Sequence, residues 1–434
     1  MKKMKILTYG CQMNVADSER MAAQLSTIGY QEVGDVETAD LILINTCCVR
    51  ESAEDRVYGK IGEIKHLKRQ NPKLIFGICG CMAQKEGENL IRRAPHIDFV
   101  IGTGRSGEIT NIVKNLEEIQ SHIVDTSNVD GEIQNNFPLR INNYTLFIPI
   151  MYGCNNYCTY CIVPYVRGRE RSRLPKDIIA EVENAVKAGV VEITLLGQNV
   201  NSYGKDHKLS NFAELLTEVD KINGLQRLRF MTSHPKDLSD ELITAIRNGK
   251  NICEHIHLPV QYGSDKILQK MNRGYTVDKY RQLVKKIREQ IPNVSITTDL
   301  IVGFPGETDE TFDETLDFIR DIKFDAAYTF IYSKRSGTPA AKFDNQVDDK
   351  IKHERLQKLM DVQNQISLEI NEQLKDEILE ILVEGASKTD ETTFTGRTRT
   401  NKLVLFKHNN EQAGDLINVK ITQPQTWVLK GEVV

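Results

Sequence analysis

Short apolar runs alternate with longer amphipathic stretches along most of this 434-residue chain, and that alternation restricts its fold more than any other feature. In residues 3–118 the strand-like runs are 5–9, 40–45, 74–79 and 99–101, and the helix-like stretches are 17–28, 51–69, 84–93 and 107–119. Strands that alternate with helices form βαβ units, whose strands pair in parallel. This first segment is therefore predicted to be an α/β domain with a doubly wound parallel sheet.

The alternation resumes in residues 140–372 with a longer period. Its strand-like runs are 146–151, 191–196, 228–232, 256–260, 296–302 and 328–332. Six βα units are too few for a closed eight-stranded barrel, so we expect a partial (β/α)6 barrel. A charged amphipathic helix over 353–375 is expected to leave that barrel, and residues 120–143 read as a linker.

The last segment, residues 373–434, changes to short strands separated by turns. Its strand-like runs are 378–383, 403–407, 417–421 and 427–429. Such spacing predicts a small C-terminal all-β barrel of the oligonucleotide-binding size class.

Composition excludes several classes of protein. No apolar run approaches the ~20 residues that span a bilayer, and the basic start is followed by no hydrophobic export segment. We therefore expect a cytoplasmic protein without a membrane partner. The formal net charge of −4 gives no global sign of nucleic-acid binding, so such a site has to be argued locally.

The nine cysteines are the strongest functional signal. Their odd number, without an export signal, argues against a disulfide framework and favours metal binding. Three of them, Cys154, Cys158 and Cys161, form a CxxxCxxC motif after the first strand of the second segment. Zinc would require a fourth ligand, and a ferredoxin-type site would require a fourth cysteine before proline. The motif instead predicts a 4Fe-4S cluster with one iron left open.

This motif resembles the radical S-adenosylmethionine superfamily, in which the open iron chelates S-adenosylmethionine. The resemblance implies that the cofactor is cleaved to a 5′-deoxyadenosyl radical. Leu196-Gly197-Gln198-Asn199 and Ile301-Val302-Gly303-Phe304-Pro305-Gly306-Glu307 resemble further superfamily motifs. By that resemblance, the residues expected to bind S-adenosylmethionine are Tyr160, Gln198, Asn199, Gly303 and Glu307.

The first segment contains a second set of cysteines. Cys11, Cys47 and Cys81 each follow a predicted strand. Because the carboxyl ends of parallel strands meet at one edge of a sheet, these thiols can converge on a second metal site. Cys48, Cys79 and Cys253 are interpreted as small structural residues.

The sequence around these cysteines resembles the methylthiotransferase family. Gly10-Cys11-Gln12-Met13-Asn14, Asn45-Thr46-Cys47, Gly80-Cys81-Met82-Ala83 and Met271-Asn272-Arg273-Gly274-Tyr275-Thr276 look most like the branch that modifies N6-dimethylallyladenosine in tRNA. The ribosomal-protein branch usually has Gly-Cys-Pro-Lys-Asn at the first cysteine, and the threonylcarbamoyladenosine branch has Gly-Cys-Lys-Val-Asn. The resemblance covers essentially the whole chain and implies a cluster domain, a radical core and a TRAM barrel.

Two groups of basic residues are candidates for RNA contact. Arg167, Arg169, Arg171 and Arg173 occupy alternate positions, so an extended strand would present all four on one side. Such a row suits phosphates, although a solvated loop or ion pairs with Glu170 would explain it too. In the tail, Arg397, Arg399, Lys402 and Lys407 lie in a stretch without acidic residues.

The resemblance implies methylthiolation of carbon 2 of N6-(dimethylallyl)adenosine at position 37 of tRNA, in the anticodon stem-loop. It also implies two 4Fe-4S clusters, two molecules of S-adenosylmethionine, and an electron donor such as flavodoxin or ferredoxin. We expect a monomer, and no catalytic side chain is indicated beyond the cluster ligands.

Two alternatives stay open. The substrate could be threonylcarbamoyladenosine tRNA or a ribosomal protein side chain, or the chain could be a non-catalytic iron–sulfur RNA-binding protein. The CxxxCxxC motif argues against the last, because a purely structural cluster would not leave an iron open.

Overall fold

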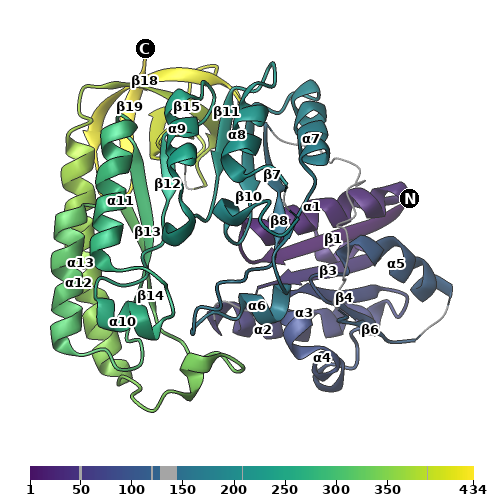
Figure 1. The fold of residues 1–434 in the computed structure, drawn as a ribbon. Coiled ribbons are helices and arrows are strands. Elements are labelled where there is room, and N and C mark those ends of the chain that lie inside the picture. Colours follow the sequence, from purple (N-terminus) through teal and green to yellow (C-terminus); the bar gives the residue numbers. More distant parts are fainter. Residues whose placement is uncertain (48–50, 119–120, 128–143, 208, 389) are drawn as a thin grey trace. The chain divides into compact units, whose positions relative to one another are not determined.

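The computed structural model describes residues 1–47, 51–118, 121–127, 144–207, 209–388 and 390–434 (Figure 1). They form two compact units. Unit 1 contains Met1–Asn142, Phe147–Tyr157 and Cys161–Glu181, and unit 2 contains Asn143–Leu146, Cys158–Tyr160 and Val182–Val434. No helix in the described ranges is long and apolar enough to cross a membrane.

Unit 1 is built on the predicted parallel sheet. Its strands are β1 (Lys2–Tyr9), β2 (Tyr30–Glu32), β3 (Leu41–Thr46), β4 (Ile75–Gly80), β5 (Phe99–Ile101) and β6 (Ile123–Asp125), in the order β2-β1-β3-β4-β5-β6. Every neighbouring pair is parallel. This confirms the doubly wound sheet. The edge strands β2 and β6 were not predicted; unlike the equally short β5, which is fully buried, they are only partly buried.

Helices cover both faces of this sheet (Figure 1). α1 (Gln12–Thr27) and α5 (Ile109–Glu118) pack on one face, and α2 (Glu51–Gln70), α3 (Cys81–Glu86) and α4 (Glu88–Arg93) pack on the other. Double coverage explains why β3 and β4 are buried along their whole length and read as continuous apolar runs. The single helix expected over 84–93 is instead divided at Gly87, whose φ is +51°.

A later segment of the chain also belongs to unit 1. It contains the hairpin strands β8 (Met151–Tyr152) and β9 (Arg171–Ser172), the short helix α6 (Val163–Arg167) and the first half of α7 (Pro175–Lys187). The two units therefore do not coincide with the three expected segments. The domain boundaries 3–118, 140–372 and 373–434 stay a prediction.

The partial barrel is confirmed as two three-stranded sheets, β11-β10-β7 and β12-β13-β14. Its strands are β7 (Thr145–Pro149), β10 (Glu192–Leu196), β11 (Arg227–Phe230), β12 (His255–His257), β13 (Ser295–Val302) and β14 (Ala326–Ile331). The helices between and after them are α8 (Phe212–Asp220), α9 (Asp240–Asn248), α10 (Asp265–Lys270), α11 (Val277–Gln290) and α12 (Asp309–Ile322). The strand ends carry the loops on which the candidate site residues of unit 2 lie.

Helix α13 (Asp349–Glu372) does not leave the barrel, contrary to expectation. Gln363 donates a hydrogen bond of 2.9 Å to the carbonyl of Phe324, and Ser367 donates one of 2.9 Å to the carbonyl of Asp325. Buried polar side chains thus hold this charged helix against the chain at the start of β14.

The C-terminal barrel is closed and all-β, as predicted. Its strands are β15 (Ile378–Ala386), β16 (Thr393–Thr398), β17 (Leu403–Lys407), β18 (Leu416–Pro424) and β19 (Leu429–Val433), in the order β15-β16-β17-β19-β18. β16 was missed because it is rich in threonine and contains Gly396. A Cβ at Gly396 would lie 2.7 Å from the carbonyl oxygen of Leu382, so this closely packed strand requires glycine there.

Candidate functional site

The three strand-end cysteines of unit 1 lie at one edge of the sheet. Strands β1, β3 and β4 are neighbours, with Tyr9 paired to Thr46 and Thr46 paired to Gly80. Cys11 caps the start of α1, Cys47 directly follows β3, and Cys81 is the first residue of α3. The expected placement at adjacent strand ends is therefore observed.

Asn14 explains the local sequence around Cys11. This buried side chain accepts bonds from the backbone N–H of Cys11 at 3.4 Å and from its thiol at 3.3 Å. Its amide nitrogen donates to the carbonyl of Thr46 at 3.2 Å, which ties the β1–α1 turn to the end of β3. A Cβ at Gly10 would lie 2.5 Å from the Asn14 amide oxygen. The Gly-Cys-x-x-Asn pattern is thus a packing requirement.

The burial of these cysteines differs. Cys11 is exposed, whereas Cys47 and Cys81 are buried. In the described ranges, no three His, Cys, Asp or Glu side chains already form a group that could hold a metal ion. Joint ligation by this triad therefore stays a prediction.

The cysteines expected to be structural are buried where the structure describes them. Cys79 lies in the core between the sheet and α1, and burial raises the pKa of its thiol well above the ordinary value. Burial also raises the pKa of Cys253. Buried neutral thiols suit packing better than metal ligation, which uses the thiolate. Cys48 lies outside the described residues.

A buried cation lies beside the thiols of unit 1. The Arg167 guanidinium donates to the Asp17 carboxylate at 3.2 Å, and both side chains are less than a tenth exposed. Burial opposes the charged form, but Cys81, Asp17 and Cys11 together raise the pKa of Arg167 well above its ordinary value. Ile162 and Val166, near the ends of α6, pack directly on Cys81. A positive charge in this position favours thiolate over thiol.

The row of four arginines expected to face RNA is not formed. Arg167 ends α6, and Gly168 follows with a φ of +74°, so the chain is not extended there. Arg173 is 1% exposed and pairs with Glu181 at 2.6 Å. Arg167 and Arg173 are therefore corrected from RNA contacts to internal ion pairs. Arg169 is exposed and Arg171 is half-buried, and both stay candidates.

The loop that begins at Cys154 is held by its own return strand. The Cys154 N–H donates to the carbonyl of Gly168 at 3.1 Å, and the Asn155 N–H donates to the Glu170 carboxylate at 3.2 Å. Gly153, with a φ of +77°, leaves no room for a side chain, because a Cβ would lie 2.0 Å from the carbonyl oxygen of Arg169. Glu170 thus bonds to Asn155, whereas the ion pairs of Arg167 and Arg173 are with Asp17 and Glu181.

In unit 2, the middle cysteine of the motif meets Arg273. The guanidinium donates to the Cys158 sulfur at 3.4 Å and to the Tyr160 hydroxyl at 3.4 Å. Thr159 between them donates its N–H to the carbonyl of Met271 at 3.1 Å. The sequence identified Met271–Thr276 only as a family resemblance. Its spatial role was missed, because more than a hundred residues separate Arg273 from the motif.

The expected S-adenosylmethionine contacts have different surroundings. Gln198 and Tyr160 are half-buried. Asn199 is buried, and its side chain donates to Asp237 at 2.8 Å and accepts from the His234 N–H at 3.2 Å. It therefore ties the loop after β10 to the loop after β11.

Glu307 is corrected from a cofactor contact to an internal anchor. Its carboxylate accepts from the Gly303 N–H at 2.7 Å and pairs with Arg355 of α13 at 2.8 Å. Its side chain has no solvent exposure. Glu307 thus fixes the turn that contains Gly303, whose φ of +73° requires glycine.

Two of the four basic residues expected to form the RNA face of the barrel hold it to the core instead. Arg399 pairs with Glu254 at 2.7 Å, and Lys402 pairs with Asp325 at 2.9 Å. From the core side, Arg229 donates to the carbonyl of Thr398 at 2.7 Å. Arg397 is bonded to Glu384 at 2.9 Å within the barrel. Of the four, Lys407 alone is classed as exposed.

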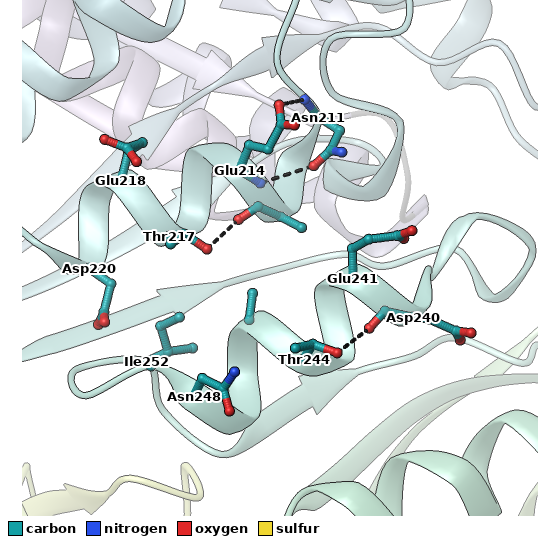
Figure 2. Close-up of a pocket in the computed structure, with 13 residues that line it drawn as sticks. Asn211, Glu214, Thr217, Glu218, Asp220, Asp240, Glu241, Thr244, Asn248 and Ile252 are labelled. Carbon is teal, nitrogen blue, oxygen red and sulfur yellow. Dashed lines mark hydrogen bonds between the residues drawn. The ribbon is translucent and has the colours of Figure 1, made fainter.

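A groove of about 580 Å³ lies between α8 and α9 of unit 2 (Figure 2). Its acidic lining consists of Glu214, Glu218, Asp220, Asp240 and Glu241. Glu214 forms a capping box with Asn211, and Asp220 accepts from the N–H groups of residues 250 and 251. These two carboxylates thus have structural roles, and the negative charge of the whole lining repels phosphate.

Three family models match parts of this chain. Residues 148–319 match the radical SAM superfamily, residues 3–102 match the uncharacterized protein family UPF0004, and residues 373–434 match the TRAM domain. In fold, the chain resembles the radical S-adenosylmethionine methyltransferase TsrM from Kitasatospora setae, with a TM-score of 0.57 at 14% identity. That match covers 89% of this chain and 79% of the other.

Sequence relatives are much closer. The chain is 52% identical to a tRNA-2-methylthio-N6-dimethylallyladenosine synthase from Carboxydothermus hydrogenoformans, over 100% of this chain and 99% of the relative. It is 50% identical to the enzyme of the same name from Clostridium tetani, over 99% and 96% of the two chains. This chain therefore belongs to the family of tRNA-2-methylthio-N6-dimethylallyladenosine synthases, within the radical S-adenosylmethionine superfamily.

Proposed function

We propose that this chain transfers a methylthio group to carbon 2 of N6-(dimethylallyl)adenosine at position 37 of tRNA. The observation that carries the proposal is about 50% identity to synthases of that name over the full chain. Membership of the radical SAM superfamily implies a 4Fe-4S cluster and S-adenosylmethionine. The adenine C2–H bond is too weakly acidic for a side-chain base, which is why a radical mechanism suits this substrate.

We assign the radical cluster to Cys154, Cys158 and Cys161. When bound, a 4Fe-4S cluster with one open iron supplies the electron for cleavage of S-adenosylmethionine. Two local bonds support the assignment, that of the Cys154 N–H to Gly168 within unit 1 and that of the Thr159 N–H to Met271 within unit 2. Tyr160, Gln198 and the backbone at Gly303 are the proposed cofactor contacts.

We assign a second 4Fe-4S cluster, the carrier of the transferred sulfur, to Cys11, Cys47 and Cys81. The donor set fits, because thiolates are the usual ligands of such clusters. Two features of unit 1 favour thiolates here. Arg167 places a buried positive charge beside Cys81, and Cys11 lies at the positive N-terminal end of the sixteen-residue helix α1.

Recognition of tRNA is assigned to exposed cations and to the substrate pocket. The exposed Arg169 and Lys407 are the proposed phosphate contacts, and the half-buried Arg171 stays a further candidate. The dimethylallyl group contributes affinity by burial, at about 0.8 kcal/mol for each CH₂-sized unit. An electron donor such as flavodoxin or ferredoxin completes the proposed system, and the enzyme acts as a monomer.

The test uses reconstituted full-length protein with S-adenosylmethionine, dithionite and a synthetic anticodon stem-loop, under anaerobic conditions. Mass spectrometry should detect 5′-deoxyadenosine and the 2-methylthio product on the dimethylallylated stem-loop. Matched stem-loops with threonylcarbamoyladenosine or unmodified adenosine should give little product. Absence of 5′-deoxyadenosine would contradict radical chemistry, and efficient modification of the control stem-loops would contradict the substrate assignment.

A further inference from the structure

Arg273 is a buried cation without a carboxylate partner in the described part of the chain. Its side chain is 5% exposed, and it donates to the Pro259 carbonyl at 2.6 Å and the Tyr275 hydroxyl at 3.0 Å. Its remaining bonds reach Cys158 and Tyr160, at 3.4 Å each. The groups that most strongly raise the pKa of this guanidinium, against its burial, are Tyr160, Tyr275 and Cys158.

The other buried arginines of this chain follow a different rule. The described pairs are Arg167 with Asp17, Arg173 with Glu181, Arg227 with Glu380, Arg229 with Glu192, and Arg355 with Glu307. Burial of an unpaired charge is costly, so proteins normally supply a counter-charge. Arg273 has no carboxylate partner among the described residues, although it is as deeply buried as the other five arginines.

The backbone around Arg273 aims it at the cysteine motif. Asn272 and Gly274, on either side, have φ values of +58° and +71°, which makes a sharp turn at this point. Thr159 is bonded to the segment twice, by its N–H to Met271 and by its hydroxyl to the carbonyl of Lys270 at 2.8 Å. The position of Arg273 against Cys158 is therefore fixed by several independent bonds.

We infer that the counter-charge of Arg273 is the thiolate-bound cluster at Cys158, and that Arg273 is a positioning residue that raises the reduction potential of that cluster. The inference rests on the proposed assignment of Cys158 as a ligand. Hydrogen bonds to ligand sulfurs and nearby positive charge stabilise the more negative, reduced form of an iron–sulfur cluster. Arg273 holds the same thiol in place.

The experiment isolates one cluster. In a chain with Cys11, Cys47 and Cys81 changed to Ala, only the radical cluster should remain, and its midpoint potential is measured by a redox titration followed by electron paramagnetic resonance. Arg273→Gln should move the midpoint to a more negative potential. Arg273→Lys, which keeps the charge, should stay near the parent value. Arg281→Gln removes a half-exposed arginine of helix α11 that pairs with Asp321, and it should leave the potential unchanged.

A second measurement compares melting temperatures at equal iron content. Cluster loading should raise the melting temperature of the parent more than that of Arg273→Gln, because only the parent gains a counter-charge. If Gln fails to fold, the Lys variant decides: a retained potential supports the inference, and a large negative shift contradicts it. An unchanged potential in Arg273→Gln also overturns the role of Arg273. Absence of iron from the triple-Ala chain overturns the ligand assignment itself, which is a distinct failure.

Discussion

The carboxylate of Asp17 lies 3.2 Å from the guanidinium of Arg167, and this buried pair joins two parts of unit 1 that are far apart in sequence. Asp17 is on α1, the helix that begins after Cys11, and Arg167 ends α6, which follows Cys161 by two residues. A second pairing joins the same two segments, because Arg20 of α1 pairs with Glu181 at 3.2 Å. Two buried ion pairs thus join helix α1, which begins after Cys11, to the segment that follows Cys161.

Asp17→Asn should strongly destabilise unit 1. It leaves Arg167 buried without its carboxylate, and loss of one partner of a buried pair costs about 3–5 kcal/mol. Replacement of both partners, Asp17→Leu with Arg167→Met, should recover part of that loss. Urea unfolding gives the free energies.

The control is Glu218→Gln, which breaks an exposed pair with Lys221 and should cost less than about 1 kcal/mol. Equal losses for the buried and exposed pairs would contradict the prediction.

Iron content should separate the two cysteine triads. Two 4Fe-4S clusters amount to about eight irons per chain, so changing either triad to Ala should leave about four. Without Cys11, Cys47 and Cys81 the chain should still cleave S-adenosylmethionine but form no methylthiolated product. Cys79→Ala and Cys253→Ala are matched controls that should keep full iron. Full iron after removal of either triad would refute its ligand assignment.

The sequence predicted the positions of the cysteines well because they depend on local periodicity. Cys11, Cys47 and Cys81 follow strands whose apolar runs are visible, and parallel pairing then places them at one edge. The arginine row failed because its prediction assumed extended backbone. α6 and the positive φ of Gly168 break that geometry.

Long-range partners could not be predicted from the sequence. Arg399 pairs with Glu254, which is 145 residues away, and Lys402 pairs with Asp325, 77 residues away. No local pattern distinguishes such a cation from one that binds phosphate. The internal roles of Glu307 and Arg273 were not predicted for the same reason. Glu307 pairs with Arg355 and Arg273 bonds to Cys158, and both partners are far away in the sequence.

Acid stability should depend on His234. Burial, together with the nearby charge of Arg273, lowers its pKa to about 3. The unfolded chain, with a histidine pKa near ~6.5, therefore binds more protons than the folded chain between about pH 6.5 and pH 3. Stability should fall as the pH falls through that window, by up to about 1.4 kcal/mol per pH unit from this residue.

His234→Gln should flatten this slope of stability against pH, as measured by urea unfolding at a series of pH values. The exposed control His66→Gln should keep the slope of the parent, and an unchanged slope in His234→Gln would contradict this assignment.

Binding of tRNA should distinguish exposed cations from those that hold the barrel. Truncation of the barrel would be a poor test, because it would strip the partners from the buried Arg227 and Arg229. Point variants avoid this problem. Arg169→Gln and Lys407→Gln each remove one proposed phosphate contact, so each should weaken binding of the anticodon stem-loop.

Each of these two changes should also lower the slope of log affinity against log salt, by about 0.7–0.9 per contact. Arg399→Gln should instead lower the unfolding free energy of unit 2, since Glu254 loses its partner, and leave the salt slope unchanged. Titrations at several KCl concentrations, with urea unfolding of the same variants, measure both quantities. If Arg399→Gln changed the salt slope while Lys407→Gln did not, the RNA surface of the barrel would lie on its core-facing cations, and the assignment of Lys407 would be wrong. Loss of affinity in Lys407→Gln at an unaltered unfolding free energy is the result that places the phosphate backbone on the exposed face of β17.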